Sequence, residues 1–222
     1  MSFTRSDQIY QELKGDILSL KLAPGTELKL QELADRLLVS KSPVRDALQQ
    51  LKSEGLVDIW PQSGTRVSLI DLSQVEVERL LRTTLEQEAV RAFCRKPDGR
   101  ALTQMRFLIE EQRWAAGQNA YLQFLQLDDA FHQQIFVGCG LGRFWDIIQS
   151  QLGNYQRVRI LSFEEPEVVP AVVESHKKLL QVLEEQNLDE ALRLESGHVR
   201  KLDTELGPLM ERFPGYFTNT KR

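Results

Sequence analysis

The stretch LADRLLVSKSPVRDALQQLKSEGLVDIWPQSGTRV, residues 33–67, carries the signals that decide the fold of the N-terminal part. Ser42 stands directly before Pro43, which is the order typical of a helix N-cap and a first helical position. The helical pattern that follows closes at Gly55, so the stretch predicts a helix over residues 42–54. Beyond Gly55, apolar and polar residues alternate on both sides of the turn PQSG, a pattern typical of a β-hairpin.

Two further helices are predicted upstream of this stretch. Residues 6–20, SDQIYQELKGDILSL, repeat apolar side chains at helical spacing and end before a turn at Pro24 and Gly25. Residues 30–38, LQELADRLL, form a second short helical pattern. Three helices followed by a two-stranded wing describe a winged helix-turn-helix, so residues 1–70 are predicted to bind DNA.

From residue 71 onward the sequence has only helical patterns. Ser73 and Glu76 have the spacing of a capping box at the start of this region. Six helical segments are predicted, at roughly residues 74–94, 99–116, 119–137, 141–161, 168–186 and 188–211. The breaks between them are short, so neighbouring helices should pack antiparallel. The predicted fold is mainly α, with a winged helix-turn-helix at 1–70 and an all-α antiparallel helical bundle at 71–222.

Charge and composition limit the possible classes of function. The net charge is −4, but residues 1–70 hold nine basic and nine acidic residues, so the excess acid lies entirely in residues 71–222. Contact with nucleic acid is therefore expected in the N-terminal part. No apolar run is long enough for a signal peptide or a membrane span, which indicates a cytoplasmic protein without membrane contact. Cys94 and Cys139 have no metal or redox spacing and receive no role.

The segment LDDAFHQQIF, residues 127–136, places Asp128 and His132 one helical turn apart on an apolar face. The other two histidines, His176 and His198, also lie on inward faces of predicted helices. Ionisable groups in a core are costly unless something satisfies them. One divalent cation shared by the carboxylate and the three imidazoles would do so. Alternatively, the histidines are hydrogen-bonded packing residues, and the spacing alone leaves both interpretations open.

Residues 33–57, followed by the wing PQSGTRV, resemble the DNA-binding domain of the GntR family of bacterial transcription regulators. The C-terminal pattern, Asp128-x-x-x-His132 followed by His176 and His198, resembles the helical effector domain of the FadR branch, called the FCD domain. The six predicted helices are more similar to the VanR-type subgroup than to the seven-helix FadR type. In metal-containing members of this branch, the matching residues bind a divalent ion beside a small-carboxylate pocket.

The resemblance therefore implies a metal site made by Asp128, His132, His176 and His198. One carboxylate and three imidazoles suit Zn, Ni, Fe or Mn, and affinity order alone does not identify the ion. Asp129 projects about a quarter-turn away on the same helix, so we do not expect it to be a ligand.

The resemblance also indicates which residues contact DNA. The start of helix 42–54 is expected to enter the major groove, and the wing tip to approach the minor groove or the backbone. The expected contacts are Lys41, Ser42, Arg45, Gly64 and Thr65. Two positions depart from the family pattern LGVSR, because Leu38 replaces the Gly and Lys41 replaces the Arg. We expect Leu38 to require a different turn geometry, and Lys41 to lack the bidentate geometry of Arg.

Arg82 matches an arginine that in relatives faces the effector cavity and pairs with a ligand carboxylate. The residues alone favour a plainer interpretation, an ion pair with Glu78 or Glu86 one turn away. A second ambiguity concerns three side chains that either border the pocket or lie on a solvated face, namely Tyr155, Arg157 and Arg159.

The sequence predicts a ligand-responsive DNA-binding transcription regulator, a repressor that is not an enzyme. A homodimer would bind double-stranded operator DNA, and a small carboxylate effector would bind in a metal-containing helical bundle. The alternative is a helical-bundle metalloenzyme with an accessory N-terminal domain, because Asp and His ligands that leave a position open can activate water. A third interpretation is a DNA-binding protein whose histidines only pack and whose bundle only dimerises.

Overall fold

The computed structural model describes residues 4–200 and 202–218, and the side chains of residues 198–205 are not among those described. The chain forms two compact units. One runs to Ser73 and also takes in the chain from Met210 onward, and the other is Gln74–Leu209. The late segment joins the first unit through the backbone, because the Ile70 N–H donates to the Tyr216 carbonyl at 2.8 Å.

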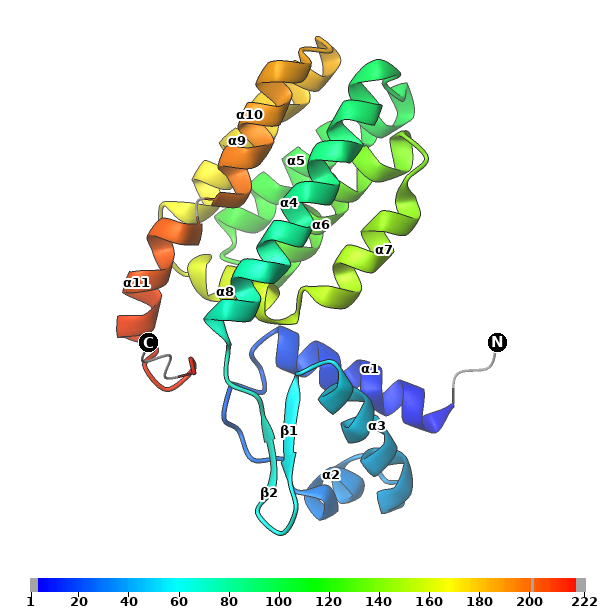
Figure 1. The fold of residues 1–222 in the computed structure, drawn as a ribbon, viewed down its shortest axis with the longest axis vertical. Coiled ribbons are helices and arrows are strands. Elements are labelled where there is room, and N and C mark those ends of the chain that lie inside the picture. The colour runs from blue at the N-terminus through cyan, green and yellow to red at the C-terminus, as the bar shows by residue number, and fades with distance from the viewer. Residues whose placement is uncertain (1–3, 201, 219–222) are drawn as a thin grey trace. The chain divides into compact units, whose positions relative to one another are not determined.

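The first unit is a winged helix-turn-helix, as predicted (Figure 1). Its helices are α1 (Arg5–Leu18), α2 (Leu30–Arg36) and α3 (Lys41–Ser53), and its strands are β1 (Val57–Trp60) and β2 (Gly64–Val67). The strands pair antiparallel, with Val57 opposite Val67 and Trp60 opposite Gly64. The helices close over a continuous apolar core whose most buried members include Leu13, Ile17, Val44 and Leu51.

The start of α3 differs from the prediction by one residue. The helix begins at Lys41 with Ser40 as its N-cap, so Ser42 is not the cap and Pro43 is the third helical residue. The amides of a helix's first turn have no partner within the helix, so a proline is tolerated anywhere in that turn. The Ser-Pro order therefore marked the first turn but not the boundary.

The prediction that Leu38 would need a different turn geometry is wrong. Leu38 lies in the left-handed region that glycine favours, with φ of 53°. The Leu38 N–H donates to Asp35 O at 3.2 Å and the Val39 N–H to Ala34 O at 3.0 Å, which is the Schellman pattern that ends a helix. The turn between α2 and α3 thus keeps the glycine-type conformation, with a leucine side chain that is 90% exposed.

The second unit is built from helices (Figure 1). They are α4 (Leu72–Arg95), α5 (Gly99–Gly117), α6 (Tyr121–Gly138), α7 (Gly142–Gln151), α8 (Gly153–Ser162), α9 (Val168–Glu184), α10 (Leu188–Arg200) and α11 (Leu202–Arg212), the last of which continues into the first unit. Helix α5 packs against α6 and α9, and α9 packs against α10. The mainly α fold with a winged helix-turn-helix and a helical bundle is confirmed.

The predicted helix 141–161 is two helices, with a break at Leu152. The carboxylate of Glu78 on α4 accepts hydrogen bonds from the Tyr155 N–H at 2.7 Å and from the Asn154 amide at 2.9 Å. It thereby satisfies a backbone N–H at the start of α8 that the break deprives of a helical partner. Because the six predicted segments are not six helices, the VanR-type assignment is not confirmed.

The cap of α4 is also corrected. Asp71, not Ser73, supplies the capping oxygen, because its Oδ1 accepts the Ser73 N–H at 2.8 Å and the Ser73 hydroxyl at 2.7 Å. Glu76 instead pairs with Arg79 at 2.7 Å. An ionised carboxylate is a stronger acceptor than a hydroxyl and interacts favourably with a helix N-terminus, which explains the shift. Among the helices described here, none is long and apolar enough to cross a membrane.

Candidate metal centre and nucleic-acid interface

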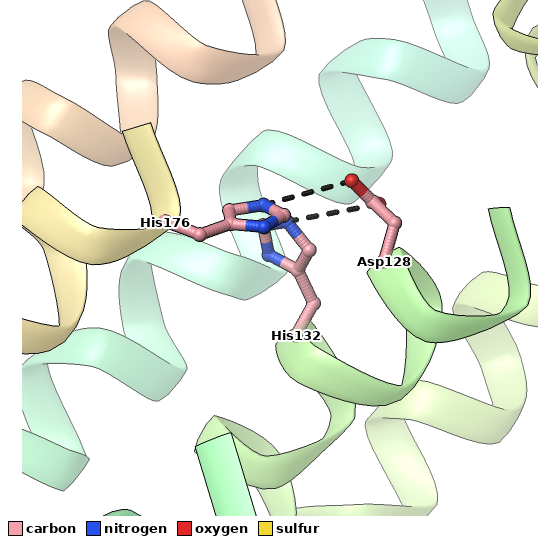
Figure 2. Close-up of side chains that lie close together, drawn as sticks. All are labelled: Asp128, His132 and His176. Carbon is pink, nitrogen blue, oxygen red and sulfur yellow. Dashed lines mark hydrogen bonds and ion pairs between the residues drawn. The ribbon is translucent and has the colours of Figure 1, made fainter. Parts of the chain in front are cut away.

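Helix α6 presents Asp128 and His132 on one face, and α9 brings His176 beside them (Figure 2). The His176 Nε2 lies 3.6 Å from Asp128 Oδ1, and the His132 Nε2 lies 3.9 Å from Asp128 Oδ2. The two Nε2 atoms are 3.3 Å apart. All three side chains are buried, and one ligand atom from each lies within 4.8 Å of the others. We call this group the Asp128 position. His198, the fourth predicted ligand, lies outside the described side chains.

The orientation of His176 suits a metal ligand. Its Nδ1 lies 2.8 Å from Gln112 Oε1, while the Gln112 amide nitrogen donates to Leu127 O at 3.0 Å. Because the Gln112 oxygen can only accept, Nδ1 carries the proton and the lone pair on Nε2 faces Asp128 and His132. Phe131 stacks on the imidazole, with ring centroids 4.2 Å apart. Such outer contacts fix the tautomer and the ring orientation of metal-binding histidines.

Two buried glutamates lie on the other side of His132. The His132 Nδ1 is 3.3 Å from Glu86 Oε1 and 3.7 Å from Glu195 Oε1, and the three residues form a second group of close ligand atoms. Both carboxylate oxygens of Glu195 are buried, and neither accepts a hydrogen bond from a nitrogen or hydroxyl donor of the described residues. Burial, together with the neighbouring charge of Glu86, raises the pKa of the Glu195 carboxyl well above its usual range.

The sequence interpretation assigned no role to Glu195. A signal was available, because Glu195 stands three residues before His198 and shares its helical face with Ala191. A glutamate in an amphipathic helix is usually solvated, however, so this spacing alone was a weak signal.

Two arginines compensate part of this negative charge. Arg159 donates to Asp129 Oδ1 at 2.8 Å and also to the Asp128 carboxylate. Arg82 Nε donates to Glu86 Oε1 at 2.9 Å, and its NH2 lies 3.8 Å from Asp128 Oδ2. That NH2 is buried and makes no hydrogen bond to any of the described residues. Burial opposes the charge of Arg82, but Glu86 and Asp128 outweigh it and raise the arginine's pKa.

The structure bears on two ambiguities about polar side chains. The ion pair of Arg82 with Glu86 is present, whereas Glu78 binds the start of α8. Three side chains that the sequence placed either at the pocket or on a solvated face are buried, so the solvated face is wrong for Tyr155, Arg157 and Arg159. Asp129 pairs with Arg159 and stands outside the group of candidate ligands.

The charges of the cluster fit a divalent cation. Four carboxylates face two guanidinium groups here, so an excess of two negative charges remains if all are ionised; the carboxylates are Glu86, Asp128, Asp129 and Glu195. Uncompensated charge inside a protein is costly, and one divalent ion would neutralise the excess. The converging imidazoles and carboxylate at the Asp128 position are also the donor types that Zn, Ni, Fe and Mn accept.

The predicted DNA-contacting residues lie at two places in the first unit. Lys41, Ser42 and Arg45 are exposed at the N-terminal end of α3. Gly64 and Thr65 begin β2 at the tip of the wing, where Gly64 adopts φ of 103°, a conformation that other residues rarely adopt. The arrangement leaves the polar start of α3 available to the major groove, as in other helix-turn-helix proteins.

Comparison with known proteins identifies the family. Residues 5–67 match the family of bacterial regulatory proteins called gntR, and residues 79–201 match the FCD domain. The chain belongs to the GntR family and carries an FCD domain. It is 28% identical to the HTH-type transcriptional repressor RspR of Escherichia coli, over 96% of this chain and 93% of that protein. It is 31% identical to an HTH-type transcriptional regulator of Streptomyces ambofaciens, over 96% and 90%.

Solved structures of GntR-type proteins share the fold. A GntR transcriptional regulator from Rhodococcus sp. RHA1 has a TM-score of 0.77 at 17% identity, covering 94% of this chain and 99% of its own. McbR/YncC from E. coli has a TM-score of 0.75 at 19% identity, covering 96% and 100%.

The GntR-family chain is thus a DNA-binding transcription regulator with a helical effector domain. The family and the named relatives are regulators and not enzymes, so the alternative of a helical-bundle metalloenzyme is not favoured.

Proposed function

We propose that this GntR-family regulator is a cytoplasmic, homodimeric repressor whose operator binding responds to a small carboxylate bound beside a divalent metal ion. One observation carries the proposal: Asp128, His132 and His176 converge on a single buried point inside a cluster with excess negative charge. A helical bundle that only joined two subunits would gain more stability from apolar residues at these positions. The metal ligands are Asp128, His132, His176 and His198, and the ion is Zn, Ni, Fe or Mn.

The effector would bind next to the metal and to Arg82. The NH2 group of Arg82 is buried and makes no hydrogen bond within the described part of the chain, while its Nε donates to Glu86. A carboxylate that accepts from this NH2 would form a charge-assisted hydrogen bond away from water, which is stronger than an exposed ion pair. An open coordination position on the metal would take a second oxygen of the same acid.

The DNA half of the proposal rests on the exposed start of α3 and the wing tip. Lys41, Ser42 and Arg45 would contact bases in the major groove, and Gly64 and Thr65 would approach the minor groove or the backbone. A homodimer matches the two-fold symmetry of a pseudo-palindromic operator. Repression, rather than activation, is supported by the E. coli relative RspR, which is a transcriptional repressor.

The operator contact is tested by Arg45→Ala. We expect the variant to lose about 1–3 kcal/mol of operator binding and to relax specificity at one base pair of each half-site. The control is Arg113→Ala, which removes an exposed cation from the second unit and should leave binding unchanged. Wild-type affinity and selectivity in Arg45→Ala would show that the recognition helix is placed wrongly.

The effector is tested by a thermal-shift screen of small organic acids with and without chelator. A ligand that binds only the folded state raises the unfolding temperature, and chelation should abolish the rise if the metal takes part. Arg82→Ala should weaken the effector response and leave operator affinity nearly intact. Equal loss of operator affinity and fold stability in this variant would instead support a purely structural ion pair with Glu86.

A further inference from the structure

His132 lies between two groups of potential ligands. Its Nε2 faces Asp128 and His176, whereas its Nδ1 is 3.3 Å from Glu86 Oε1 and 3.7 Å from Glu195 Oε1. The second group comes from three different helices, α4, α6 and α10, and its ligand atoms lie within 4.8 Å of one another. We call it the Glu195 position.

Among the described side chains of this cluster, Glu195 is the carboxylate to which no guanidinium group donates a hydrogen bond. Asp128 and Asp129 receive hydrogen bonds from Arg159, and Glu86 receives one from Arg82. Glu195 is 0% exposed, and no nitrogen or hydroxyl donor of the described residues reaches either of its oxygens. A buried carboxylate in this state needs a cation or a proton, because its desolvation is otherwise uncompensated.

We propose that Glu86, His132 and Glu195 form a second position for a divalent cation, one that favours hard ions such as Mn²⁺. Two carboxylates and one imidazole make this position richer in oxygen than the Asp128 position, which offers two described imidazoles and one carboxylate. Hard cations select oxygen ligands, whereas Zn²⁺ and Ni²⁺ bind well to imidazole. The Glu195 position therefore prefers hard ions such as Mn²⁺, and the Asp128 position prefers Zn²⁺ or Ni²⁺.

The two positions are alternatives for one cation in each chain. A neutral imidazole has one lone pair, so His132 coordinates through Nε2 or through Nδ1 and keeps a proton on the other nitrogen. A metal at the Asp128 position leaves Nδ1–H to donate toward Glu86. Two divalent ions would also exceed the cluster's excess of two negative charges. Filling the Asp128 position therefore empties the Glu195 position.

The test is metal binding by the full-length protein, with Mn²⁺ and Zn²⁺ as the probes and free Mn²⁺ measured by electron paramagnetic resonance. We expect Glu195→Gln to weaken Mn²⁺ binding by about tenfold or more and to change Zn²⁺ affinity little. Asp128→Asn should weaken Zn²⁺ binding and retain Mn²⁺ binding. In the wild type, Zn²⁺ should release one Mn²⁺ per chain. Glu88→Gln, on the exposed side of α4, is the matched control.

Unchanged Mn²⁺ affinity in folded Glu195→Gln would overturn the proposal and leave Glu195 as a protonated acid. If one Mn²⁺ and one Zn²⁺ bind to the same chain together, the two positions are not alternatives for one cation. If Glu195→Gln does not fold, Glu195→Asp keeps the charge on a shorter side chain and should still weaken Mn²⁺ binding selectively. Different results would contradict the proposed function. These are an unchanged Zn²⁺ affinity in Asp128→Asn, or a wild-type protein that does not bind operator DNA.

Discussion

Both units of this regulator have apolar cores, but the bundle also buries a cluster of charged side chains. The winged helix-turn-helix closes over aliphatic side chains such as Leu13, Ile17 and Leu51. The bundle buries a cluster of charged and imidazole side chains that comprises Arg82, Glu86, Asp128, His132, Arg159, His176 and Glu195. The first core gains stability from apolar surface removed from water. The charged cluster of the bundle is tolerated only because its charges compensate one another, and well-packed apolar residues would serve stability as well or better.

This difference indicates where each unit carries its function. In the first unit the core only supports the surface, and the residues expected to meet DNA are exposed at the start of α3 and at the wing tip. In the second unit the buried side chains are themselves the candidate site. Metal ions should therefore alter the stability of variants in the bundle core and leave that of variants in the first core unchanged.

The largest effect is expected for Arg159→Ala. The variant leaves Asp128 and Asp129 without their guanidinium partner, and breaking a buried pair in this way costs about 3–5 kcal/mol of unfolding free energy. Because the cluster becomes more negative, Zn²⁺ should raise the melting temperature of this variant more than that of the wild type. Denaturant unfolding of the metal-free proteins measures the loss of unfolding free energy. Thermal scans with Zn²⁺ measure the rise in melting temperature. A loss no larger than that of the exposed Arg113→Ala would show that the buried ion pairs of Arg159 do not stabilise the bundle.

Leu51→Ala tests the apolar core in the same assay. Leu51 is fully buried, so its truncation should cost about 2–5 kcal/mol through lost apolar contact and a residual cavity. Neither Zn²⁺ nor a chelator should alter this loss, because no metal ligand lies in that core. Recovery of Leu51→Ala by Zn²⁺, measured as the change in unfolding free energy, would show that the two cores are not distinct in the way described.

Leu38→Gly is expected to have the smallest effect and the opposite sign. Leu38 has φ of 53° and a side chain that is 90% exposed, so glycine relieves backbone strain and removes no packing. Because a left-handed conformation costs about 1 kcal/mol or more for a residue with a Cβ, we expect a gain approaching that size in denaturant unfolding. Leu37→Gly, at φ of −89° one residue earlier, should destabilise the unit. A loss of stability in Leu38→Gly would show that the backbone at Leu38 is not strained.

Much of the fold could be predicted because its signals are local. Apolar spacing gave the helices, and the alternation around PQSG gave the wing. The break at Leu152 could not be predicted, because the Glu78 carboxylate that supports it comes from another helix. The left-handed turn at Leu38 was missed because the sequence places no glycine there.

The candidate site was predicted only in part. Asp128 and His132 share a helical face, so their spacing in the sequence indicated their proximity. The convergence of His176 on them was expected from inward-facing positions and is present in the structure. Glu195 was missed because its importance depends on the lack of a hydrogen-bond donor to its oxygens among the described residues, which only tertiary packing determines. Helical spacing in a sequence can indicate that a charged residue is buried, but it does not indicate which groups from other helices contact it.

Elemental analysis of the native protein, purified without chelators, shows whether the bundle holds a metal ion. It should be made beside a His132→Ala/His176→Ala double variant, because both imidazoles lie at the Asp128 position and one of them also faces Glu195. We predict nearly one divalent metal ion per chain in the wild type and little in the double variant. A wild-type protein that contains no metal and takes none up when divalent ions are added would contradict the account.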